Sequence, residues 1–496
     1  LGADLDAYSA VGILRPAVVV SVADRSTRVF VKGIGFEPIG WDGLSWARRA
    51  RGHQSLGPAP KSAGDVVSPG DVVYVATDGK QTQLAQIPRA QAALVALDPT
   101  DGAIAALVGG FDYFASKYNR AVDAKRQPGS GFKPFLYSAA LDDGFTPGSI
   151  LLDEPIVVDN RGMEAAWRPE NDGGTFQGPI RLREALAWSR NLASIRLLRR
   201  VGIAQVTSYA ARFGFDPRQL PQNLTLALGT LQTTPLQMAA AYAVFANGGF
   251  RVEPYFIERI VGPHGKVIFQ AQPKIACPSC ETSSSAQAAR AEPAGSQPTG
   301  ISGPMTPAAL VAAADASRGG RGALPAARLA PRVISAQNDY LMTSLLQSVI
   351  TEGTGQRALA LHRDDIAGKT GTTNRGRNTC DAWFNGYTEH LVATVWVGYD
   401  DERALGPGEE GAHTALPIWV YFMQKALEGV PQERRPMPDG LVTLRISPTT
   451  GRLVSAENPD GILETFMANH LPVAGPSSET GNTSGGTQTA AGASLF

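Results

Sequence analysis

The sequence is poor in cysteine and histidine, and this argues against a disulfide scaffold and a metal centre. It has three cysteines and six histidines in 496 residues. Three cysteines are too few for a fold held together by disulfides. Cys277 and Cys280 form one CxxC pair, but no second CxxC, HxxxH or HExxH motif supplies the remaining ligands of a zinc site. We therefore expect no metal and no cofactor, and we interpret the pair as a loop disulfide or two idle thiols.

The chain also lacks an excess of basic residues and a long apolar run. Lys and Arg together number 45, as do Asp and Glu, so the chain has no surplus charge for binding nucleic acid. No apolar run approaches the roughly 20 residues that cross a bilayer, and the richest stretch, 238–246, is expected to be a buried helix. Because the sequence begins at Leu1 without a signal peptide, we expect a fragment or processed form whose membrane anchor lies in a missing N-terminal segment.

The composition predicts a folded protein of more than one domain. Apolar residues make up 43% of the chain and charged residues 18%, which permits a sizeable core and excludes global disorder. A length of 496 residues indicates two or three units with separate cores. Shifts in composition predict a β unit at 1–90, a second unit at 91–270 that continues at 331–435, a low-complexity insert at 271–330, and a C-terminal hairpin with a disordered tail at 436–496.

The first unit is predicted to be a small β-barrel and the second an α+β fold. β-Branched runs at 18–22, 27–31 and 72–76 are typical of short strands. In the second unit, strand patterns stand at both ends and helical patterns between them. Its expected elements are strands at 94–97, 103–108, 382–387 and 391–399, and helices at 135–141, 181–188, 193–201, 236–245 and 340–350. A last hairpin is expected to pair 441–446 with 451–455.

Ser130 and Lys133 form the single S-x-x-K motif of the chain. Gly129 and Pro134 fit a loop that enters a helix, where side chains at i and i+3 share one face. A serine needs an adjacent base to attack at neutral pH. A lysine can be that base when burial and a neighbouring cation lower its pKa. Taken alone, the motif is a weak signal and is more typical of a capping serine near a solvated lysine.

Two further short motifs also occur once each. Ser189-Arg190-Asn191 lies between two helical patterns, so we expect a turn that presents a hydroxyl and an amide; an ordinary helix N-cap is the simpler interpretation. Lys369-Thr370-Gly371-Thr372 is predicted to be a strand whose glycine permits close approach of a substrate backbone; a polar strand end is the alternative.

Together, in this order and these contexts, the three motifs resemble the active site of penicillin-binding proteins and class A β-lactamases. The flanking sequence resembles the transpeptidase domain of bifunctional class A penicillin-binding proteins over roughly 91–270 and 331–430, and 1–90 resembles their OB-like domain, mainly by position. This implies an antiparallel sheet flanked by helices, preceded by an OB-like β-barrel, without the family's glycosyltransferase half. The residues that carry the resemblance are Asn119-Arg120-Ala121, Arg126-Gln127-Pro128-Gly129-Ser130, Phe132-Lys133-Pro134-Phe135, Trp167-Arg168-Pro169-Glu170-Asn171, Leu182-Arg183-Glu184-Ala185-Leu186, Gly353-Thr354-Gly355 and Asp381-Ala382-Trp383-Phe384.

The resemblance implies a serine-type DD-transpeptidase. Ser130 would attack the carbonyl of the penultimate D-Ala of a peptidoglycan stem peptide, with Lys133 as the base. Ser189 would relay a proton to the leaving amine, and Asn191 would hold the substrate amide. An amine from a second stem peptide would then resolve the acyl-enzyme into a cross-link.

The K-T-G motif would bind the substrate carboxylate. Lys369 would position both that carboxylate and the SxN serine, and the hydroxyls of Thr370 and Thr372 would donate to it, with Gly371 between them. The backbone N–H groups of Ser130 and Thr372 would form the oxyanion hole.

The same resemblance implies partners and a location. The partners are stem peptides, as D-Ala-D-Ala donor and amine acceptor, and β-lactams; the OB-like domain is a candidate docking site for other cell-wall synthesis proteins. The location is the periplasmic face of the inner membrane. A DD-carboxypeptidase or serine β-lactamase shares the motifs, although no clear water-activating Glu stands between Asn191 and Lys369. An inactive sensor built on this fold is the alternative of another class, and its relatives usually lose the Ser or the Lys.

Overall fold

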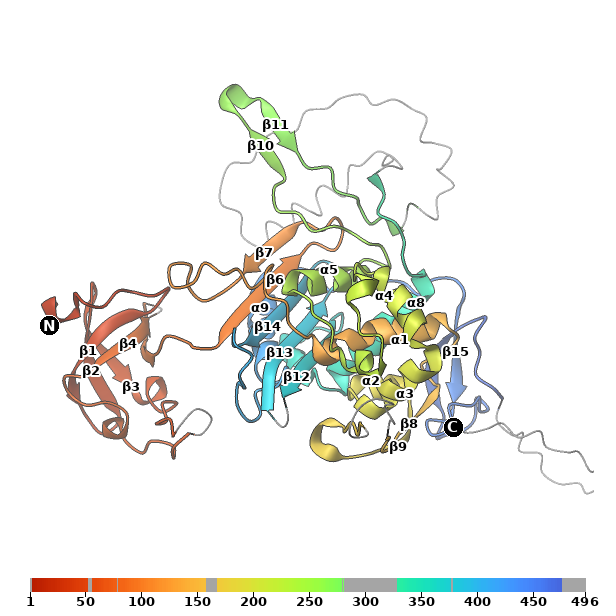
Figure 1. The fold of residues 1–496 in the computed structure, drawn as a ribbon, viewed down its shortest axis with the longest axis horizontal. Helices are drawn as coiled ribbons and strands as arrows, with labels where there is room; N and C mark the ends of the chain where they lie inside the picture. Colours follow the sequence, from red (N-terminus) through yellow and green to blue (C-terminus); the bar gives the residue numbers. More distant parts are fainter. Residues whose placement is uncertain are drawn as a thin grey trace, which may run out of the picture.

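The computed structural model describes residues 2–51, 56–77, 79–157, 167–278, 280, 328–375 and 378–474. A small β unit at the N-terminal end lies beside a larger unit in which a sheet and helices pack together (Figure 1). The predicted α+β class is confirmed, as is the β unit before it.

The N-terminal unit is one antiparallel sheet with its own core. Its strand order is β3-β2-β1-β4-β5, and the two edge strands, β3 and β5, contact each other, which curls the sheet towards a barrel. The predicted strands at 18–22, 27–31 and 72–76 fall within β1, β2 and β4. The strands are β1 Arg15–Val22, β2 Ser26–Val31, β3 Gly35–Gly40, β4 Val72–Thr77 and β5 Thr82–Ala85.

The larger unit is built on a five-stranded antiparallel sheet with the order β12-β13-β14-β6-β7. Strand β6, from the start of this unit, pairs with β14, about 300 residues further along the sequence, between Gln91–Gly398 and Leu97–Val392. All of the strand positions predicted for this unit coincide with observed strands. They are β6 Gln91–Leu97, β7 Ile104–Val108, β12 Ala367–Arg375, β13 Asn378–Tyr387 and β14 Val392–Gly398.

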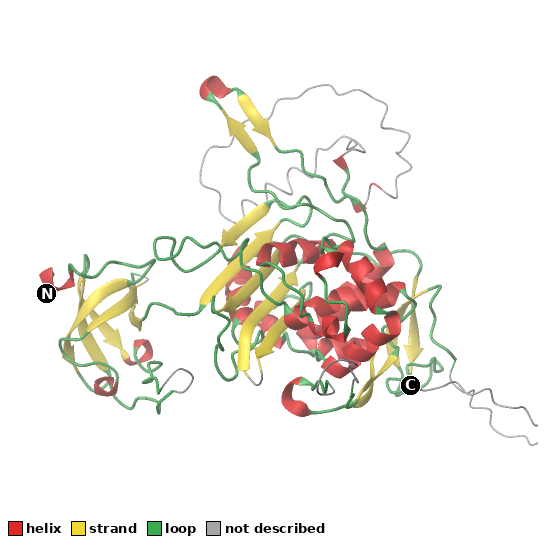
Figure 2. Ribbon diagram, viewed as in Figure 1, coloured by secondary structure: helices red, strands yellow, loops and turns green. Residues whose placement is uncertain are grey.

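Strands β13 and β14 are buried almost throughout, because helices cover both faces of this sheet. Helices α5 and α8 pack on one face and α9 on the other (Figure 2). Every predicted helix is present, and α5 begins as predicted, with Thr234 as N-cap and Pro235 in the first turn; α4 and α9 were not predicted. The helices are α1 Lys133–Asp142, α2 Leu182–Ala187, α3 Asn191–Val201, α4 Ile203–Ala211, α5 Pro235–Ala246, α8 Ala336–Thr351 and α9 Ala415–Ala426.

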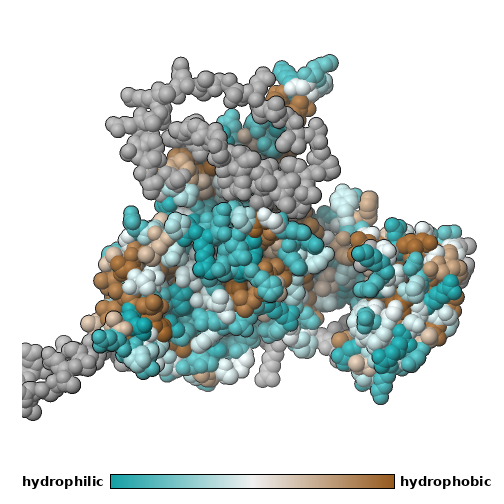
Figure 3. Space-filling view, turned by 180° about the vertical axis from the view of Figure 1, so that it is seen from behind, coloured by the Kyte–Doolittle hydropathy of each residue, from teal (hydrophilic) through white to brown (hydrophobic). Residues whose placement is uncertain are grey.

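Three two-stranded sheets complete the described structure. They are β8 Ile150–Asp153 with β9 Gly178–Arg181, β10 Arg259–Val261 with β11 Val267–Gln270, and β15 Leu441–Ile446 with β16 Ile462–Met467. The β10–β11 hairpin projects from the larger unit (Figure 1), and its strand residues are exposed. Seen from behind, apolar residues form separate patches on both units (Figure 3).

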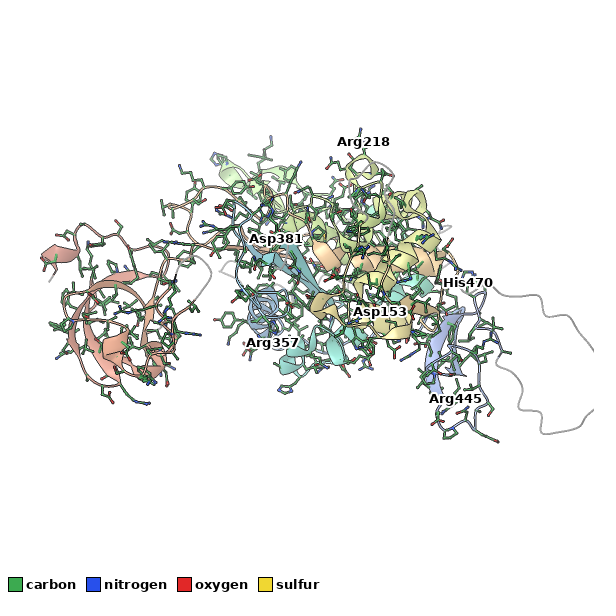
Figure 4. All side chains as sticks on the ribbon, turned by 60° about the horizontal axis from the view of Figure 1, so that its bottom comes forward. Asp153, Arg218, Arg357, Asp381, Arg445 and His470 are labelled. Carbon is green, nitrogen blue, oxygen red and sulfur yellow. A yellow bond between two sulfur atoms is a disulfide. The ribbon has the colours of Figure 1, made fainter. Side chains whose placement is uncertain are left out.

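The predicted C-terminal hairpin has the wrong second strand. We expected 441–446 to pair with 451–455, but β15 pairs with β16, and only a single bridge joins Ile446 to Leu453. The reason is burial: β16 places Glu464 and Phe466 against the larger unit, where they are 4% and 0% exposed. The nearer segment has no comparable apolar face. Figure 4 marks this C-terminal module by Arg445 and His470 at one end of the molecule.

The start of the predicted insert is part of the packed domain. Ile275 and Ala276 are buried, and the backbone of Ile275 pairs with residues 328 and 330. Cys277 and Cys280 form a disulfide, which is one of the two interpretations given above. The rest of the insert, 281–327, and the tail beyond 474 lie outside the described residues. Within the described ranges, no group of acidic, histidine or cysteine side chains could hold a metal ion, and no helix is both long and apolar enough to cross a membrane.

Candidate active site

The serine of the S-x-x-K motif lies in a short 3-10 turn, η4 Gly129–Phe132, that leads directly into α1. Pro134 stands in the first turn of α1, as predicted. Ser130 is half-buried, whereas Lys133 is completely buried. The side chain of Ser130 makes no hydrogen bond to any residue that the structure describes. The described hydrogen bonds of the Lys133 amine go to the SxN turn and not to the Ser130 hydroxyl.

Backbone close contacts bring the S-x-x-K and K-T-G motifs together. A Cβ on Gly129 would lie 2.2 Å from the carbonyl oxygen of Thr372, and a Cβ on Gly371 would lie 2.4 Å from that of Pro128. Gly129 also has a φ of +54°. Both distances are shorter than real Cβ contacts allow, so only glycine at both positions lets the Ser130 turn lie directly on β12.

The SxN motif lies on the turn between α2 and α3, as predicted, and contacts the lysine of the first motif. Ser189 has a φ of +56°, a conformation that residues other than glycine rarely adopt. The Nζ of Lys133 lies 2.7 Å from the carbonyl oxygen and 3.2 Å from the Oγ of Ser189, and 2.8 Å from the Oδ1 of Asn191. A neutral amine can donate two of these hydrogen bonds and accept the third from the hydroxyl.

An asparagine outside the three motifs caps the helix that carries Asn191. The Oδ1 of Asn171 accepts from the backbone N–H groups of Asn191 and Leu192, at 2.8 and 3.2 Å, so the N-cap role that we considered for Ser189 is taken by another segment. The Nδ2 of Asn191 donates to the carbonyl of Glu170 at 3.0 Å. The sequence could have pointed to Asn171 as a site residue, because it ends the Trp167–Asn171 stretch that carries the family resemblance.

The central residue of the SxN motif forms a buried ion pair. Arg190 donates through Nε to the Oδ2 of Asp153 at 2.6 Å and through Nη2 to the carbonyl of Thr175. Asp153, at the end of β8, is 0% exposed and also accepts from Asn171 Nδ2 at 2.7 Å and from the N–H of Gln177 at 3.0 Å. Arg190 thus holds the SxN turn in place through its ion pair with Asp153, while Ser189 and Asn191 contact Lys133.

Removing Asp153 is expected to destabilise the fold strongly. In Asp153→Ala the buried guanidinium of Arg190 loses its counter-charge, which costs about 3–5 kcal/mol for a buried pair. Asp401→Ala is the matched control, because its partner Arg403 is half-exposed and such pairs contribute about 0–1 kcal/mol. Denaturant unfolding of both variants measures the difference. Equal stabilities would contradict the anchoring role of Arg190.

Lys369 lies on β12, the edge strand of the central sheet, and is completely buried. Its Nζ lies 3.1 Å from the carbonyl oxygen and 3.3 Å from the Oγ1 of Thr370. The predicted contact with Ser189 is not present among the described hydrogen bonds. Thr370 Oγ1 also lies 2.6 Å from Thr354 Oγ1, and Thr372 Oγ1 accepts from the N–H of Gly411 at 3.1 Å.

Burial lowers the pKa of both lysines. Burial lowers the pKa of Lys369 to about 7. The pKa of Lys133 lies well below its ordinary value, first because of burial and then because of the positive charge of Lys369; Arg190 lowers it further, while Asp172 and Asp153 oppose the shift. Both shifts favour the neutral amine, and the charge of Lys369 is one of the causes of the shift at Lys133.

The segment before Ser130 is tied to the central sheet. Arg126 donates through Nε to Asp381 at 2.7 Å, and Trp396 donates to the same carboxylate oxygen at 2.9 Å. Thr373 Oγ1 and Trp383 Nε1 both donate to the carbonyl of Gln127, each at 2.9 Å. Figure 4 shows Asp381 on the sheet. These contacts fix the position of the turn that holds the serine.

Comparison with known protein families assigns the same two units. A family model described as penicillin binding protein transpeptidase domain matches residues 92–403, and one described as penicillin-binding protein OB-like domain matches residues 1–90. Among curated relatives, penicillin-binding protein 1A of Pseudomonas aeruginosa is 45% identical over 488 residues, which cover 93% of this chain and 55% of that protein. The Escherichia coli protein of the same name is 37% identical, over 92% of this chain and 56% of its own length. The chain thus spans little more than half the length of these relatives.

Solved structures agree with this assignment. Penicillin-binding protein 1A from Haemophilus influenzae superimposes with a TM-score of 0.77 at 34% identity, over 95% of this chain and 65% of that one. PonA1 from Mycobacterium tuberculosis, solved in complex with penicillin V, gives a TM-score of 0.53 at 26% identity, over 71% of this chain and 82% of that one. The chain therefore belongs to the penicillin-binding protein family of the 1A type, with an OB-like domain before a transpeptidase domain.

Proposed function

We propose that this chain is the peptidoglycan DD-transpeptidase portion of a bifunctional cell-wall synthase, acting through a serine acyl-enzyme at Ser130. The observation that carries the proposal is the convergence of the three motifs: Lys133 contacts the SxN turn, and the Ser130 turn lies on the K-T-G strand. A nucleophile, a base of lowered pKa and a buried cation are the parts that acyl transfer requires.

In the acylation step, the neutral amine of Lys133 takes the proton of the Ser130 hydroxyl as its oxygen attacks the carbonyl of the penultimate D-Ala. The negative charge that develops on the carbonyl oxygen is stabilised by the N–H groups of Ser130 and Thr372. The C–N bond to the terminal D-Ala then breaks. The leaving amine takes the hydroxyl proton of Ser189, and Lys133 returns the proton that it took from Ser130 to the Ser189 oxygen. Attachment of the K-T-G strand to the Ser130 turn keeps the nucleophile and both N–H donors in one place.

Substrate placement falls to the remaining site residues. Asn191 holds the substrate amide, and Lys369 with Thr370 and Thr372 holds the terminal carboxylate, with Gly371 allowing close approach. An amine of a second stem peptide resolves the ester into a cross-link. We place the site at the periplasmic face of the inner membrane, with the anchor and the glycosyltransferase half outside this sequence, and the OB-like domain as a docking site for other cell-wall synthesis proteins.

The second-order rate constant of acylation is expected to have a bell-shaped pH dependence. It rises with pH as Lys133 loses its proton, and it falls above about 7 as Lys369 loses the charge that holds the carboxylate. Stopped-flow acylation by a chromogenic β-lactam between pH 5 and 9 measures both limbs. In Lys369→Arg the cation persists, so the alkaline limb should move upward by more than one pH unit. An unchanged alkaline limb in that variant would assign it to another group.

A donor pentapeptide ending in D-Ala-D-Ala, supplied with an amine acceptor, tests the proposed reaction. We expect release of D-Ala together with a cross-linked product. D-Ala released with water as the only acceptor would identify a carboxypeptidase, and a β-lactam adduct lost within seconds would identify a β-lactamase. If neither turnover nor an adduct is observed, the protein has kept the fold without the activity.

A further inference from the structure

Arg183, in the first turn of α2, connects three segments that are far apart in the sequence. Its Nε and Nη2 donate to the two carboxylate oxygens of Glu464, at 2.8 and 2.6 Å. Its Nη1 donates to the carbonyl of Ser344 and the hydroxyl of Ser348, both at 3.0 Å, and Nη2 also donates to Ser344 Oγ at 3.1 Å. All five N–H donors of the guanidinium are therefore used. The side chains of Arg183 and Glu464 are only 12% and 3% exposed.

The first of the joined segments, α2, leads to the SxN turn. This helix has fewer than two turns, from Leu182 to Ala187. Ser189 lies two residues after its end and donates its N–H to the carbonyl of Leu186 at 3.1 Å. The backbone and hydroxyl of Ser189 contact Lys133. A displacement of α2 along or about its axis would therefore move Ser189 relative to the base.

The second segment, α8, leads to the K-T-G strand. Ser344 and Ser348 lie in its C-terminal half, and three residues after its end Thr354 donates its N–H to the carbonyl of Ala187 at 3.2 Å. The hydroxyl of Thr354 lies 2.6 Å from that of Thr370, beside Lys369. Arg183 thus holds α2 and α8 together. The SxN turn follows the first of these helices, and Thr354, which contacts the K-T-G strand, follows the second.

The third segment, β16, supplies the charge that makes this arrangement possible. Without Glu464, the buried guanidinium of Arg183 would have no counter-charge in direct contact, since its other partners are serine hydroxyls and a carbonyl. Arg181 adds only a longer contact, 3.8 Å from Glu464 Oε2. The acid comes from the C-terminal module, beyond residue 403, where the match to the transpeptidase family model ends.

We propose that Glu464 is a positioning residue of the active site: through Arg183 it sets the spacing between the SxN turn and the K-T-G strand, so the C-terminal β15–β16 hairpin is a working part of the transpeptidase. This inference rests on the proposed function. It concerns the rate of acylation and not the affinity for the β-lactam, because neither residue is among those that would touch substrate. A misplacement of about 1 Å at a reacting group can slow catalysis by about 100-fold.

The experiment separates positioning from mere stabilisation by comparing one single and one double variant. In Glu464→Gln we expect the first-order acylation constant to fall by about 10- to 100-fold, with the non-covalent dissociation constant of the β-lactam within about twofold of the wild type. Its melting temperature should also fall, because Arg183 is left as a buried cation. In Arg183→Met/Glu464→Leu, apolar side chains replace the pair, so the melting temperature should recover while acylation stays slow.

Glu457→Gln is the matched control, since Glu457 is an exposed acid of the same C-terminal module, and it should behave as the wild type. Acylation at the wild-type rate in the double variant would overturn the inference and leave Glu464 a purely structural residue. A wild-type chain that forms no adduct at all would instead overturn the proposed function, and this inference with it.

Discussion

Ser130→Ala is expected to abolish covalent labelling by a fluorescent penicillin completely. The substitution removes the hydroxyl oxygen that we propose forms the ester, and no neighbouring hydroxyl replaces it at the start of α1. The fold should remain intact, because the Ser130 hydroxyl makes no hydrogen bond to the described residues and alanine is compatible with a 3-10 turn. We therefore expect a melting temperature within a few degrees of the wild type. Gel fluorescence after denaturation and a thermal melt measure the two effects.

The control for this result is another serine. Ser455 is exposed in the C-terminal module, and Ser455→Ala should retain full labelling. Residual labelling of a folded Ser130→Ala protein at more than a few per cent would show that a second nucleophile exists.

Lys133→Arg and Lys133→Met are expected to reduce the acylation rate by about 10²- to 10⁴-fold, the usual contribution of a general base. Arginine keeps a charge that cannot be removed near neutral pH, whereas methionine fills the buried space without a charge. Both lose the titratable amine that lies 2.7 to 3.2 Å from the SxN turn. Rapid-mixing acylation kinetics with a chromogenic β-lactam measure the loss.

The pair of variants also separates the two roles of the lysine. If only the charge of Lys133 mattered, the arginine variant would acylate at nearly the normal rate and the methionine variant would not. If Lys133 only filled space, the methionine variant would retain activity. Near-normal acylation in either variant would move the base elsewhere.

The elements that carry the three motifs could be predicted from the sequence because their signals are local. Gly129 and Pro134 mark a helix entry, and two helical patterns around Ser189 leave a turn between them. The strand order of the central sheet was harder to predict, since β6 joins β14 across about 300 residues. For the C-terminal hairpin, the nearest segment in the sequence, 451–455, is the wrong partner, because burial of Phe466 and Glu464 decides the pairing of β15 with β16.

The residues that hold the motifs in place were not predicted as such. The SxN motif leaves its middle position, Arg190, unspecified. Its partner Asp153 lies 37 residues earlier, and no sequence pattern links the two. Arg183 and Glu464 are 281 residues apart. Ion pairs of this kind depend on the final packing of helices and strands, which no periodicity encodes. The glycines were more informative, because Gly129 and Gly371 permit close approach whatever their partners are.

Mass spectrometry of the wild-type chain after reaction with a β-lactam is the most direct test of whether Ser130 forms an ester. The intact mass should increase by one β-lactam per chain and survive denaturation, because an ester persists after the fold is lost. Proteolysis should place the added mass on the peptide that contains Ser130, at that side chain. An adduct on any other serine, or no adduct on a folded protein, would show that Ser130 is not the nucleophile.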